Sequence, residues 1–357
     1  MRIVQIIDSL EIGGAEKMAV NYANALSEKL EFSGLVATRA EGNLKSQLNS
    51  SVSYFFLKKT KTLDFGAAFR LRNYCKTNQI THLQPHSSSY FTALLTKLIH
   101  PKIKIVWHDH NGLSEFISTQ KSLVLKLASF FFSGIIVVNF KLKNWAEKEL
   151  NCSQVVYLPN FTQADASAKA ETILKGTVGK RILCLANLRD QKNHFFLLEV
   201  AEKLKLTQPD WTFHLVGKDF KDAYSQQLSD FIVQKGLQDT VFIYGSRNDV
   251  SAIISQSDIT ILTSKSEGLP VALIEYGLHK KPVVTTNVGE IPLIIKDGEN
   301  GFITGAQDVA SFYEKVNTLT HEPGLRVQLG DALYQTIKAH HSEEGVIEQY
   351  LNWVKTL

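Results

Sequence analysis

Cysteine is scarce in this sequence, and its scarcity excludes several kinds of site. Only three cysteines occur among the 357 residues, and Cys75, Cys152 and Cys184 lie far apart along the chain. A disulfide framework needs paired cysteines, and zinc or redox motifs typically need a C-x-x-C spacing. The sequence therefore predicts neither kind of site, and it fits a protein of a reducing compartment such as the cytoplasm.

Long apolar runs are absent as well. The most apolar segment is S-L-V-L-K-L-A-S-F-F-F-S-G-I-I-V-V-N-F at residues 122–140, and Lys126 and the pair Ser133-Gly134 interrupt it. Because a membrane-spanning helix needs about 18 unbroken apolar residues, we predict a buried helix followed by a core strand here. The first residues, M-R-I-V-Q-I-I, are typical of a strand, so we expect no export signal.

Acidic residues are sparse in the first half of the chain. Residues 1–162 hold 19 Lys and Arg against 11 Asp and Glu, and the remaining residues hold 20 against 24. A basic half can attract an anionic partner or an anionic membrane surface, although the same lysines can simply form a solvated face. We expect no nucleic acid partner.

Short β-branched runs alternate with amphipathic helical patterns along the chain. With 357 residues, of which 44% are hydrophobic, the chain is long enough for two cores, because single cores stop growing at roughly 250–300 residues. The alternation predicts an α/β fold with parallel sheets covered by helices on both faces. The predicted strands are I-V-Q-I-I from Ile3, G-L-V-A-T from Gly34, V-S-Y-F-F-L from Val52, I-K-I-V-W from Ile103, G-I-I-V-V from Gly134, R-I-L-C-L-A from Arg181, F-H-L-V-G from Phe213, V-F-I-Y-G from Val241, I-T-I-L-T from Ile259 and P-V-V-T-T from Pro282.

A small, polar and strandless stretch, T-Q-A-D-A-S-A-K-A-E-T from Thr162, divides this pattern. We predict two doubly wound Rossmann-like domains at residues 1–163 and 180–338, joined by a linker at residues 164–179. A final helix is predicted within residues 339–357, with Ser342 as a candidate N-cap. Its apolar face comprises Val346, Ile347, Tyr350, Leu351, Val354 and Leu357 at helical spacing.

The loop after the first strand is one candidate site, because ligands of such sheets bind at the carboxyl ends of the strands. In D-S-L-E-I-G-G-A-E, Gly13 and Gly14 would let the backbone approach a phosphate or a sugar just before a helix. A plain tight turn explains the two glycines equally well. The dinucleotide fingerprint G-x-G-x-x-G is absent from this loop.

The second candidate loop is S-E-G-L-P-V-A-L-I-E-Y-G at residues 266–277, which carries two glutamates eight positions apart. Pro270 suits the first helical turn, so we predict that a helix begins there. The backbone amides of Gly268–Val271 would then form an anion site suited to a diphosphate. Glu267 and Glu275 straddle this site and could accept hydrogen bonds from hydroxyls of the two sugars that flank a diphosphate. Alternatively, Glu267 only caps the helix and Glu275 is a surface residue.

Several further motifs follow one another in a defined order. Between Val241 and Phe302 the chain carries Y-G-S-R-N-D-V, S-D-I-T-I-L-T-S, the glutamate loop, K-P-V-V-T-T-N-V-G and D-G-E-N-G-F. I-G-G-A-E lies at the front, W-H-D-H-N in the middle and N-L-R-D-Q-K-N after the linker. This set closely resembles glycosyltransferase family four over nearly the whole chain. The resemblance implies that the chain is a retaining transferase of the GT-B fold. In this fold two Rossmann-like domains face a central cleft, and a C-terminal helix crosses back to the first domain.

The resemblance also implies roles for individual residues. Glu267 would hold hydroxyls of the donor hexose, and Glu275 would bind the ribose. The family places a histidine after a front-domain strand, where it faces the donor sugar. His108 and His110 both qualify, because alternation puts them on one side of an extended segment, and we favour His110. A metal site would also explain H-D-H, but no D-x-D accompanies it and this fold typically works without a bound cation. The amides that would contact the diphosphate lie in the stretch Gly268, Leu269, Pro270 and Val271.

Around Lys192 the chain departs from the family pattern. Members usually carry Gly-Arg-hydrophobic with a lysine five residues past the arginine; here Lys192 occupies the lysine position, but Asn187 stands at the arginine position. We infer that Arg189, two residues further on, substitutes for the usual arginine, because two cations neutralise a leaving diphosphate better than one. Glu290 also stands where a glycine is usual, and Leu293 where an acid is usual.

The motifs together predict a retaining glycosyltransferase. It would move a hexose from a nucleotide-diphosphate sugar to a hydroxyl of a glycan or lipid-linked acceptor, in cell-surface polysaccharide or glycoconjugate assembly. The alternatives are a sugar-nucleotide epimerase of the same fold, against which the spacing of the glutamates argues, and a non-catalytic sugar-binding subunit, against which Glu267, Glu275, Lys192 and His110 argue. We expect no metal and no cofactor, and a cytoplasmic protein that is peripheral at the inner face of the membrane if the basic half binds there.

Overall fold

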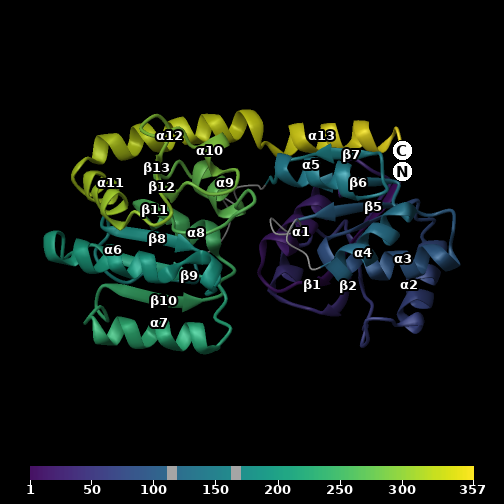
Figure 1. Cartoon of the computed structure of the whole chain (residues 1–357), viewed down its shortest axis with the longest axis horizontal. Helices are drawn as coiled ribbons and strands as arrows, with labels where there is room; N and C mark the ends of the chain where they lie inside the picture. Colours follow the sequence, from purple (N-terminus) through teal and green to yellow (C-terminus); the bar gives the residue numbers. More distant parts are fainter. Residues whose placement is uncertain (111–118, 162–169) are drawn as a thin grey trace. The chain divides into compact units, whose positions relative to one another are not determined.

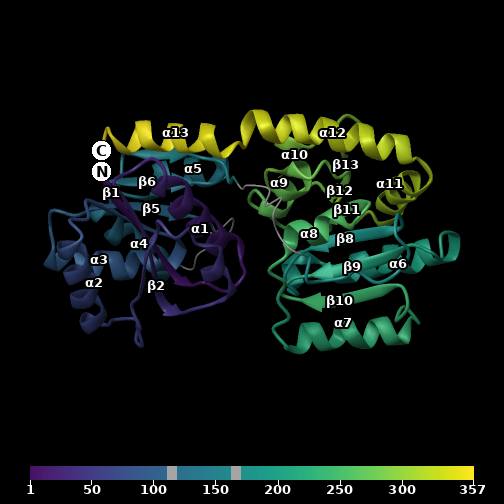
Figure 2. The ribbon, with the colours of Figure 1, turned by 180° about the vertical axis from the view of Figure 1, so that it is seen from behind.

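The chain forms two compact units in a computed structural model that describes residues 1–110, 119–161 and 170–357. Unit 1 comprises Met1–Phe161 and Glu343–Leu357, and unit 2 comprises Thr162–Ser342. Each unit contains a parallel sheet with helices packed against it (Figure 1, Figure 2). The predicted α/β class with two doubly wound domains is confirmed.

The sheet of unit 1 has seven parallel strands among the described residues. They are β1 (Arg2–Ser9), β2 (Phe32–Ala40), β3 (Ser53–Phe56), β4 (His82–Pro85), β5 (Lys104–Asp109), β6 (Gly134–Val137) and β7 (Val155–Tyr157). Their order is β3-β2-β1-β4-β5-β6-β7, and Gln5 of β1 lies between Leu35 of β2 and Gln84 of β4. The strand order reverses between β1 and β4, and ligands of open α/β sheets bind outside the carboxyl ends of strands at such a switch point.

Helices cover both faces of this sheet because its strands are apolar on both sides. Along β1, Val4 and Ile6 enter one apolar core and Ile7 enters another, as the alternation of side chains requires. The helices are α1 (Gly14–Ser27), α2 (Phe65–Thr77), α3 (Tyr90–Ile99), α4 (Thr119–Ala128) and α5 (Phe140–Glu149), with 3₁₀ turns η1 (Asn43–Gln47), η2 (Ser87–Ser89) and η4 (Ser129–Phe131). Asp64 and Asn139 cap α2 and α5 by accepting hydrogen bonds from backbone amides.

Unit 2 repeats the same plan with six parallel strands among its described residues. They are β8 (Arg181–Leu185), β9 (Thr212–Val216), β10 (Val241–Gly245), β11 (Ile259–Leu262), β12 (Val283–Thr286) and β13 (Phe302–Thr304). Their order is β10-β9-β8-β11-β12-β13, so this sheet reverses between β8 and β11. Ile182 and Cys184 of β8 enter one core, and Leu183 enters the core on the opposite face.

The helices of unit 2 bury these two faces. They are α6 (His194–Thr207), α7 (Ala223–Gln234), α8 (Val250–Ser255), α9 (Val271–Leu278), α10 (Ile291–Ile294), α11 (Val309–His321) and α12 (Pro323–His340), with the 3₁₀ turn η5 (Asp190–Lys192). Helix α9 packs closely on α12 at Gly277, where an added β-carbon would lie only 2.5 Å from Ile337. Gly277 therefore lets α9, which follows the second candidate loop, lie directly on α12.

The C-terminal helix α13 (Glu343–Val354) belongs to unit 1, as the predicted crossover requires. Its Tyr350 ring lies 5.2 Å from the ring of Tyr22 on α1 in an edge contact, and both rings are fully buried. Trp353 lies against β6, where a β-carbon on Gly134 would come within 2.6 Å of the indole ring. Figure 1 and Figure 2 show α13 in yellow beside β6 and β7. The end of the chain thus completes the core of the unit that contains its beginning.

We expect deletion of residues 342–357 to lower the melting temperature of unit 1, because the deletion uncovers the Tyr22 side of its core. The single substitution Tyr350→Ala is expected to cost about 3–5 kcal/mol of unfolding free energy, as truncation of a buried aromatic typically does. Hydrogen exchange of unit 1 amides during thermal unfolding measures both effects. Glu348→Ala on the exposed face of α13 is the matched control. Unaltered stability of unit 1 in the deletion variant would rule the crossover out.

The segment before β6 differs from the sequence prediction. The strand β6 is buried as predicted, but α4 is not a buried helix: Leu125 and Ala128 are buried, whereas Leu123 and Leu127 are 59% and 56% exposed. Only one side of α4 packs on the sheet, because a surface helix of a doubly wound fold has a single sheet to cover. Among the described residues, no helix is both long and apolar enough to cross a membrane.

The predicted domain limits also shift in the structure. Residues 164–169 of the predicted linker lie outside the described residues, but residues 170–179 pack on unit 2. There, Asp249 accepts hydrogen bonds from the amides of Glu171 and Thr172, and Leu174 enters an apolar core. At the other end, α12 continues to His340, beyond the predicted limit at residue 338. Composition did not reveal that residues 170–179 belong to unit 2, because backbone amides, which every such stretch possesses, make these hydrogen bonds to side chains of unit 2.

Candidate functional site

The loops that follow β8 and β11 lie side by side at the switch point of unit 2. The two strands are paired, with Ile259 beside Ile182 and Thr260 beside Leu183. Their carboxyl ends therefore bring residues 186–193 and residues 263–270 together. These loops contain Asn187, Arg189, Lys192 and Glu267, all of which the sequence singles out.

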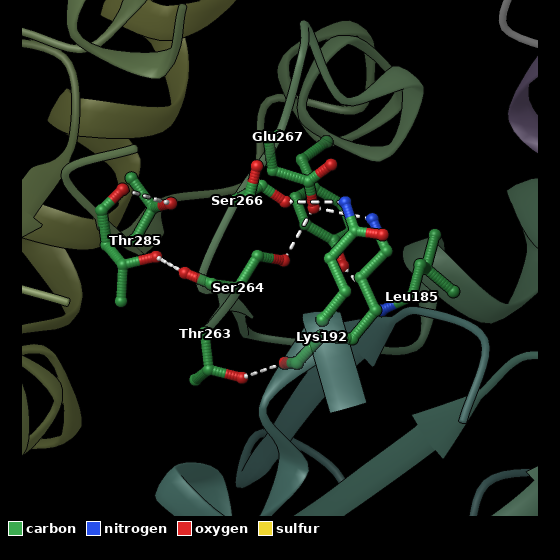
Figure 3. A network of polar contacts seen from close by, with 10 residues as sticks. Leu185, Lys192, Thr263, Ser264, Ser266, Glu267 and Thr285 are labelled. Atoms are coloured by element: carbon green, nitrogen blue, oxygen red, sulfur yellow. Dashed lines mark hydrogen bonds and ion pairs between the residues drawn. The ribbon is translucent and has the colours of Figure 1, made fainter. Parts of the chain in front are cut away.

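Lys192 and Glu267 form an ion pair at the centre of these loops. Lys192 Nζ lies 2.5 Å from Glu267 Oε1, and the Ser264 hydroxyl donates a 2.5 Å hydrogen bond to the same oxygen. Figure 3 shows the lysine and the serine converging on the carboxylate. The glutamate side chain is 7% exposed and the lysine side chain 23%. Because removal of one partner of such a pair leaves an uncompensated charge, the two side chains act as one unit.

Hydrogen bonds join the two loops on either side of this ion pair. Gln191 Nε2 donates to the Ser266 carbonyl at 2.8 Å, and the Lys265 amide donates to the Gln191 carbonyl at 2.8 Å. The Thr263 hydroxyl donates to the Lys192 carbonyl at 3.0 Å (Figure 3). Five residues of the two loops are thus held in fixed register, which places Lys192 opposite Glu267 before any ligand binds.

Helix α9 begins one residue later than predicted. Pro270 has φ −70° and ψ 125°, so it is extended and precedes the helix, which starts at Val271. Pro270 also has no N–H, so it shapes the turn but offers no donor to an anion. The Leu185 amide at the end of β8 donates to the Tyr276 hydroxyl at 2.7 Å. This bond fixes α9 to the central strand and thereby fixes the neighbouring, half-buried Glu275.

Asn187 and Arg189 both reach the loop that follows β9. Asn187 Oδ1 accepts a 2.8 Å hydrogen bond from the Lys218 amide, and the Arg189 guanidinium lies 4.4 Å from the centre of the Phe220 ring. Arg189 is exposed, and its stacking on Phe220 restricts its motion. Asn187 therefore supports the loop that follows β9. Lys192 and Arg189 lie on one loop but contact different partners, because Lys192 pairs with Glu267 and Arg189 stacks on Phe220.

The loop that follows β12 packs on the backbone of the glutamate loop. Gly289 has φ 58°, and a β-carbon there would lie 2.0 Å from the Glu267 carbonyl oxygen, so glycine is required. The Glu290 amide donates to the Gly268 carbonyl at 3.1 Å. Glu290 is 8% exposed and Leu293 is 63% exposed. Of the two departures from the family pattern, Glu290 thus lies on a loop that contacts the predicted anion site, and Leu293 lies in α10, which follows that loop.

The predicted histidines of unit 1 form a cluster with a third one, His86. His108 is buried within β5, and His110 is half-buried just after it. Their ring centres lie 3.9 Å apart, which agrees with the expectation that both side chains lie on one side of the segment. His86 follows β4, the strand beside β5, and its Nδ1 lies 2.7 Å from His110 Nε2. Of the two predicted histidines, only His110 is partly exposed to solvent, because His108 is buried.

Burial keeps all three imidazoles neutral. It lowers the pKa of His110 to about 3, and it lowers the pKa values of His86 and His108 well below their ordinary range, with a further contribution from neighbouring imidazoles. Each ring offers one nitrogen, and these nitrogens lie within 4.8 Å of one another, so the cluster could hold a metal ion. An ion bound between His86 and His110 would have to displace the proton of their hydrogen bond.

The two glycines of the first candidate loop lie at the N-terminus of α1. Gly13 is the N-cap residue, with φ −165°, and Gly14 is the first helical residue. A β-carbon on Gly14 would meet no atom of the described residues within 4 Å. Packing among the described residues therefore does not require glycine at position 14, whereas a β-carbon on Gly13 would collide with the Glu16 carboxylate.

Sequence patterns missed His86 and the two glutamines that bind the cluster, Gln5 and Gln84. The strand β4, His82–Pro85, is only four residues long and ends in proline, which argues against a central strand. The proline is tolerated because it is the last residue, and the next amide, of His86, restores the bond to Ile6. What His86 and His110 share is that each is the residue directly after a strand, β4 and β5 respectively.

Comparison with known proteins places this architecture among glycosyltransferases. Residues 167–336 match the family model described as glycosyl transferases group 1. An uncharacterized glycosyltransferase of Haemophilus influenzae is 23% identical over 349 residues, which cover 95% of each chain. The UDP-Gal:alpha-D-GlcNAc-diphosphoundecaprenol alpha-1,3-galactosyltransferase of Escherichia coli is 23% identical over 348 residues, which cover 88% of this chain and 87% of that one.

Among solved structures, Anabaena Alr3699/HepE in complex with UDP and glucose is similar over its full length. The TM-score is 0.82 at 18% sequence identity, and the match covers 100% of both chains. At this identity the likeness establishes the fold, which is the predicted GT-B arrangement of two Rossmann-like domains.

Proposed function

Because the chain belongs to the glycosyltransferases that share the group 1 domain and the GT-B fold, we propose that it transfers a hexose from a nucleotide-diphosphate sugar. The acceptor is a hydroxyl of a glycan or of a lipid-linked saccharide, and the transfer retains the anomeric configuration. The E. coli relative is named for transfer to a diphosphoundecaprenol-linked sugar, which supports an acceptor of this class. The proposed context is the assembly of a cell-surface polysaccharide or glycoconjugate.

The observation that carries this proposal is the Lys192–Glu267 pair beside the N-terminus of α9. Departure of a nucleoside diphosphate leaves an oxocarbenium-like sugar and a growing negative charge on the leaving group. A fixed cation and the first amides of a helix stabilise that charge most in the transition state. We assign Lys192, Arg189 and the amides of Gly268, Leu269 and Val271 to the diphosphate, Glu267 to the hexose hydroxyls and Glu275 to the ribose.

Retention follows from the same residues in this proposal. Glu267 is engaged with Lys192 and Ser264, so it is committed to positioning rather than to nucleophilic attack on the sugar. The acceptor hydroxyl would then attack from the face that the diphosphate leaves, and its proton would pass to the departing diphosphate. His110 would contact the donor sugar, and no metal ion is needed for this chemistry. A chelator should therefore leave turnover unchanged.

A lipid-linked acceptor would require the protein to meet a membrane, and α4 and η4 offer a suitable surface. We define the α4 surface as Leu123, Val124, Leu127, Phe130 and Phe131, which are between 42% and 65% exposed. Exposed Lys126 lies among them, and exposed Lys141 and Lys148 follow on α5. Apolar side chains beside lysines suit the boundary of an anionic bilayer, where the chains insert and the ammonium groups meet lipid phosphates.

We expect the full chain to co-sediment with phosphatidylglycerol vesicles at low salt and to bind neutral phosphatidylcholine vesicles much more weakly. Each lysine near the surface contributes roughly 1 kcal/mol, so binding should weaken as ionic strength rises. The double substitution Leu127→Ser with Phe130→Ser should reduce binding, whereas Leu206→Ser on the exposed part of α6 is the matched control. Equal sedimentation with both lipids, or no effect of the double substitution, would remove the membrane proposal.

The donor can be identified by thermal shift against a panel of nucleotide sugars. A ligand that binds only the folded state raises the melting temperature by an amount that its affinity sets. One nucleotide sugar should stabilise the chain more than its own nucleoside diphosphate does, because Glu267 adds contacts to the hexose. If neither the sugars nor the diphosphates shift the transition, the proposal fails.

A further inference from the structure

The histidine cluster is part of a buried chain of hydrogen bonds. His86 Nε2 lies 2.8 Å from Gln5 Oε1, Gln5 Nε2 lies 3.2 Å from Gln84 Oε1, and Gln84 Nε2 lies 3.2 Å from His108 Nδ1. At the other end, His86 Nδ1 lies 2.7 Å from His110 Nε2. Gln5, Gln84 and His86 have no exposed surface. This network of hydrogen bonds links the half-buried His110 to β1 and β4, the strands on either side of the switch point.

Each hydrogen bond in this chain fixes the direction of the next. The Gln5 carbonyl oxygen can only accept, so His86 carries its proton on Nε2. A neutral His86 then has a lone pair on Nδ1 and must accept from His110, which therefore carries its proton on Nε2. The rings of His86 and His110 are nearly parallel, at 9°, which suits a direct N–H···N bond in one plane. The Gln84 amide likewise donates to His108 Nδ1, which leaves the His108 proton on Nε2.

The opposite arrangement would require both glutamine amides to turn over and every proton to move. In that arrangement His108 would hold its lone pair on Nε2, which is buried without a hydrogen-bond partner among the described residues. The Tyr22 ring lies next to the His108 ring in a T-shaped contact, with 5.4 Å between ring centres and 85° between ring planes. An N–H beside an aromatic ring is better tolerated than a lone pair there. The donor and acceptor of every hydrogen bond in this network are therefore set at its buried end, His108.

We propose that His86, Gln5 and Gln84 act as positioning residues that hold His110 in the neutral tautomer with its proton on Nε2. This inference rests on the proposed function, because it concerns the group that His110 presents to the donor. With Nε2–H engaged by His86, the other ring nitrogen, Nδ1, carries a lone pair and can only accept. His110 thus selects a hydroxyl of the bound sugar, and it offers no hydrogen to a carbonyl, a carboxylate or a phosphate oxygen.

The tautomers can be read directly without any substrate. Long-range ¹H–¹⁵N correlation spectra of the ¹⁵N-histidine-labelled full chain at neutral pH distinguish a protonated Nδ1 from a protonated Nε2. We expect His86, His108 and His110 all to carry the proton on Nε2. His110 protonated on Nδ1 in the wild-type chain would overturn the proposal, whatever the protein transfers.

Two substitutions at one position test the coupling. His86→Asn keeps an amide oxygen that can accept from His110, whereas His86→Leu removes the acceptor. We expect His86→Asn to retain the Nε2–H form of His110, and His86→Leu to give a mixture of tautomers. His214, which bonds Thr212 and Tyr244 in unit 2, is the internal reference that neither substitution should change.

Kinetics with the identified donor provide the second readout. His86→Leu should lower kcat by about tenfold, the low end of what outer partners of a functional histidine contribute, while the affinity for free nucleoside diphosphate stays unchanged. His86→Asn should restore most of the loss. An unaltered His110 tautomer in His86→Leu would contradict the coupling, and so would equal loss of kcat in both variants. If no nucleotide sugar binds, the proposed function is wrong. The tautomer spectra, which need no substrate, still show whether His86 positions His110.

Discussion

Replacing Glu267 with alanine is expected to lower the turnover number by roughly 10²-fold while sparing the affinity for free nucleoside diphosphate. The carboxylate is assigned to the transferred hexose, which free diphosphate lacks, so only the reacting sugar loses a partner. The loss also leaves Lys192 without the partner that holds its ammonium group 2.5 Å away. Loss of one preorganised electrostatic contact typically costs about 10²–10³ in kcat.

Glu275 should show the reverse pattern. Glu275→Ala is expected to weaken binding of the free nucleoside diphosphate, because the ribose belongs to that ligand, and calorimetric titration measures this directly. Ser264→Ala is a matched control for Glu267, since it removes one hydrogen bond to the same oxygen but keeps the charge. Equal loss of nucleotide affinity in the two glutamate variants would refute the division of labour between them.

Arg189→Ala is expected to lower kcat by roughly 10²-fold or more, within the range for loss of one transition-state cation. Lys192 and Arg189 are the two cations that we assign to the leaving diphosphate. The guanidinium lies over Phe220 at 4.4 Å, and a long planar side chain held in this way can pair with a phosphate through two hydrogen bonds. The substitution should therefore affect the chemical step more than the folded state.

Asn187→Ala is the comparison for this prediction. Its amide oxygen accepts from the Lys218 backbone, so the substitution removes a structural hydrogen bond and should cost stability of about 1–3 kcal/mol but little turnover. Steady-state kinetics with the identified donor separate the two residues. Near-normal turnover in Arg189→Ala together with loss of turnover in Asn187→Ala would show that Arg189 does not substitute for the missing arginine.

The strands that the sequence identified are those that lie within runs of apolar residues. β1, β2 and β8 bury side chains on both faces, and each contains a run of apolar residues. β4 was missed because its four residues, H-L-Q-P, include only one aliphatic side chain before the final proline. β7 and β13 were missed because each has only three residues, which is too short for a periodic pattern to emerge. Their place in the sheets comes from pairing with neighbours that are distant in the sequence.

The candidate site was predicted only as far as local motifs extend. Glu267, Lys192 and His110 could be singled out because each lies just after a strand in a recognisable motif. That Lys192 pairs with Glu267 could not be predicted, because the pair depends on β8 and β11 being neighbours. His86 was missed for the same reason: its partner His110 follows a different strand, and no sequence spacing joins them. The exposed side of α4 was also missed, because a run of apolar residues does not reveal how many of them the sheet covers.

We propose that the Lys192–Glu267 site transfers a sugar from a nucleotide-diphosphate donor to an acceptor. ³¹P NMR of a panel of nucleotide sugars in the presence of membrane lipid extract, with the wild-type chain and with Glu267→Ala, tests this transfer. We predict that one donor is converted to its nucleoside diphosphate as a glycosylated acceptor appears, and that Glu267→Ala slows both by roughly 10²-fold. Failure to consume any donor, release of the sugar as a free epimer, or equal rates for the two proteins would contradict the claim.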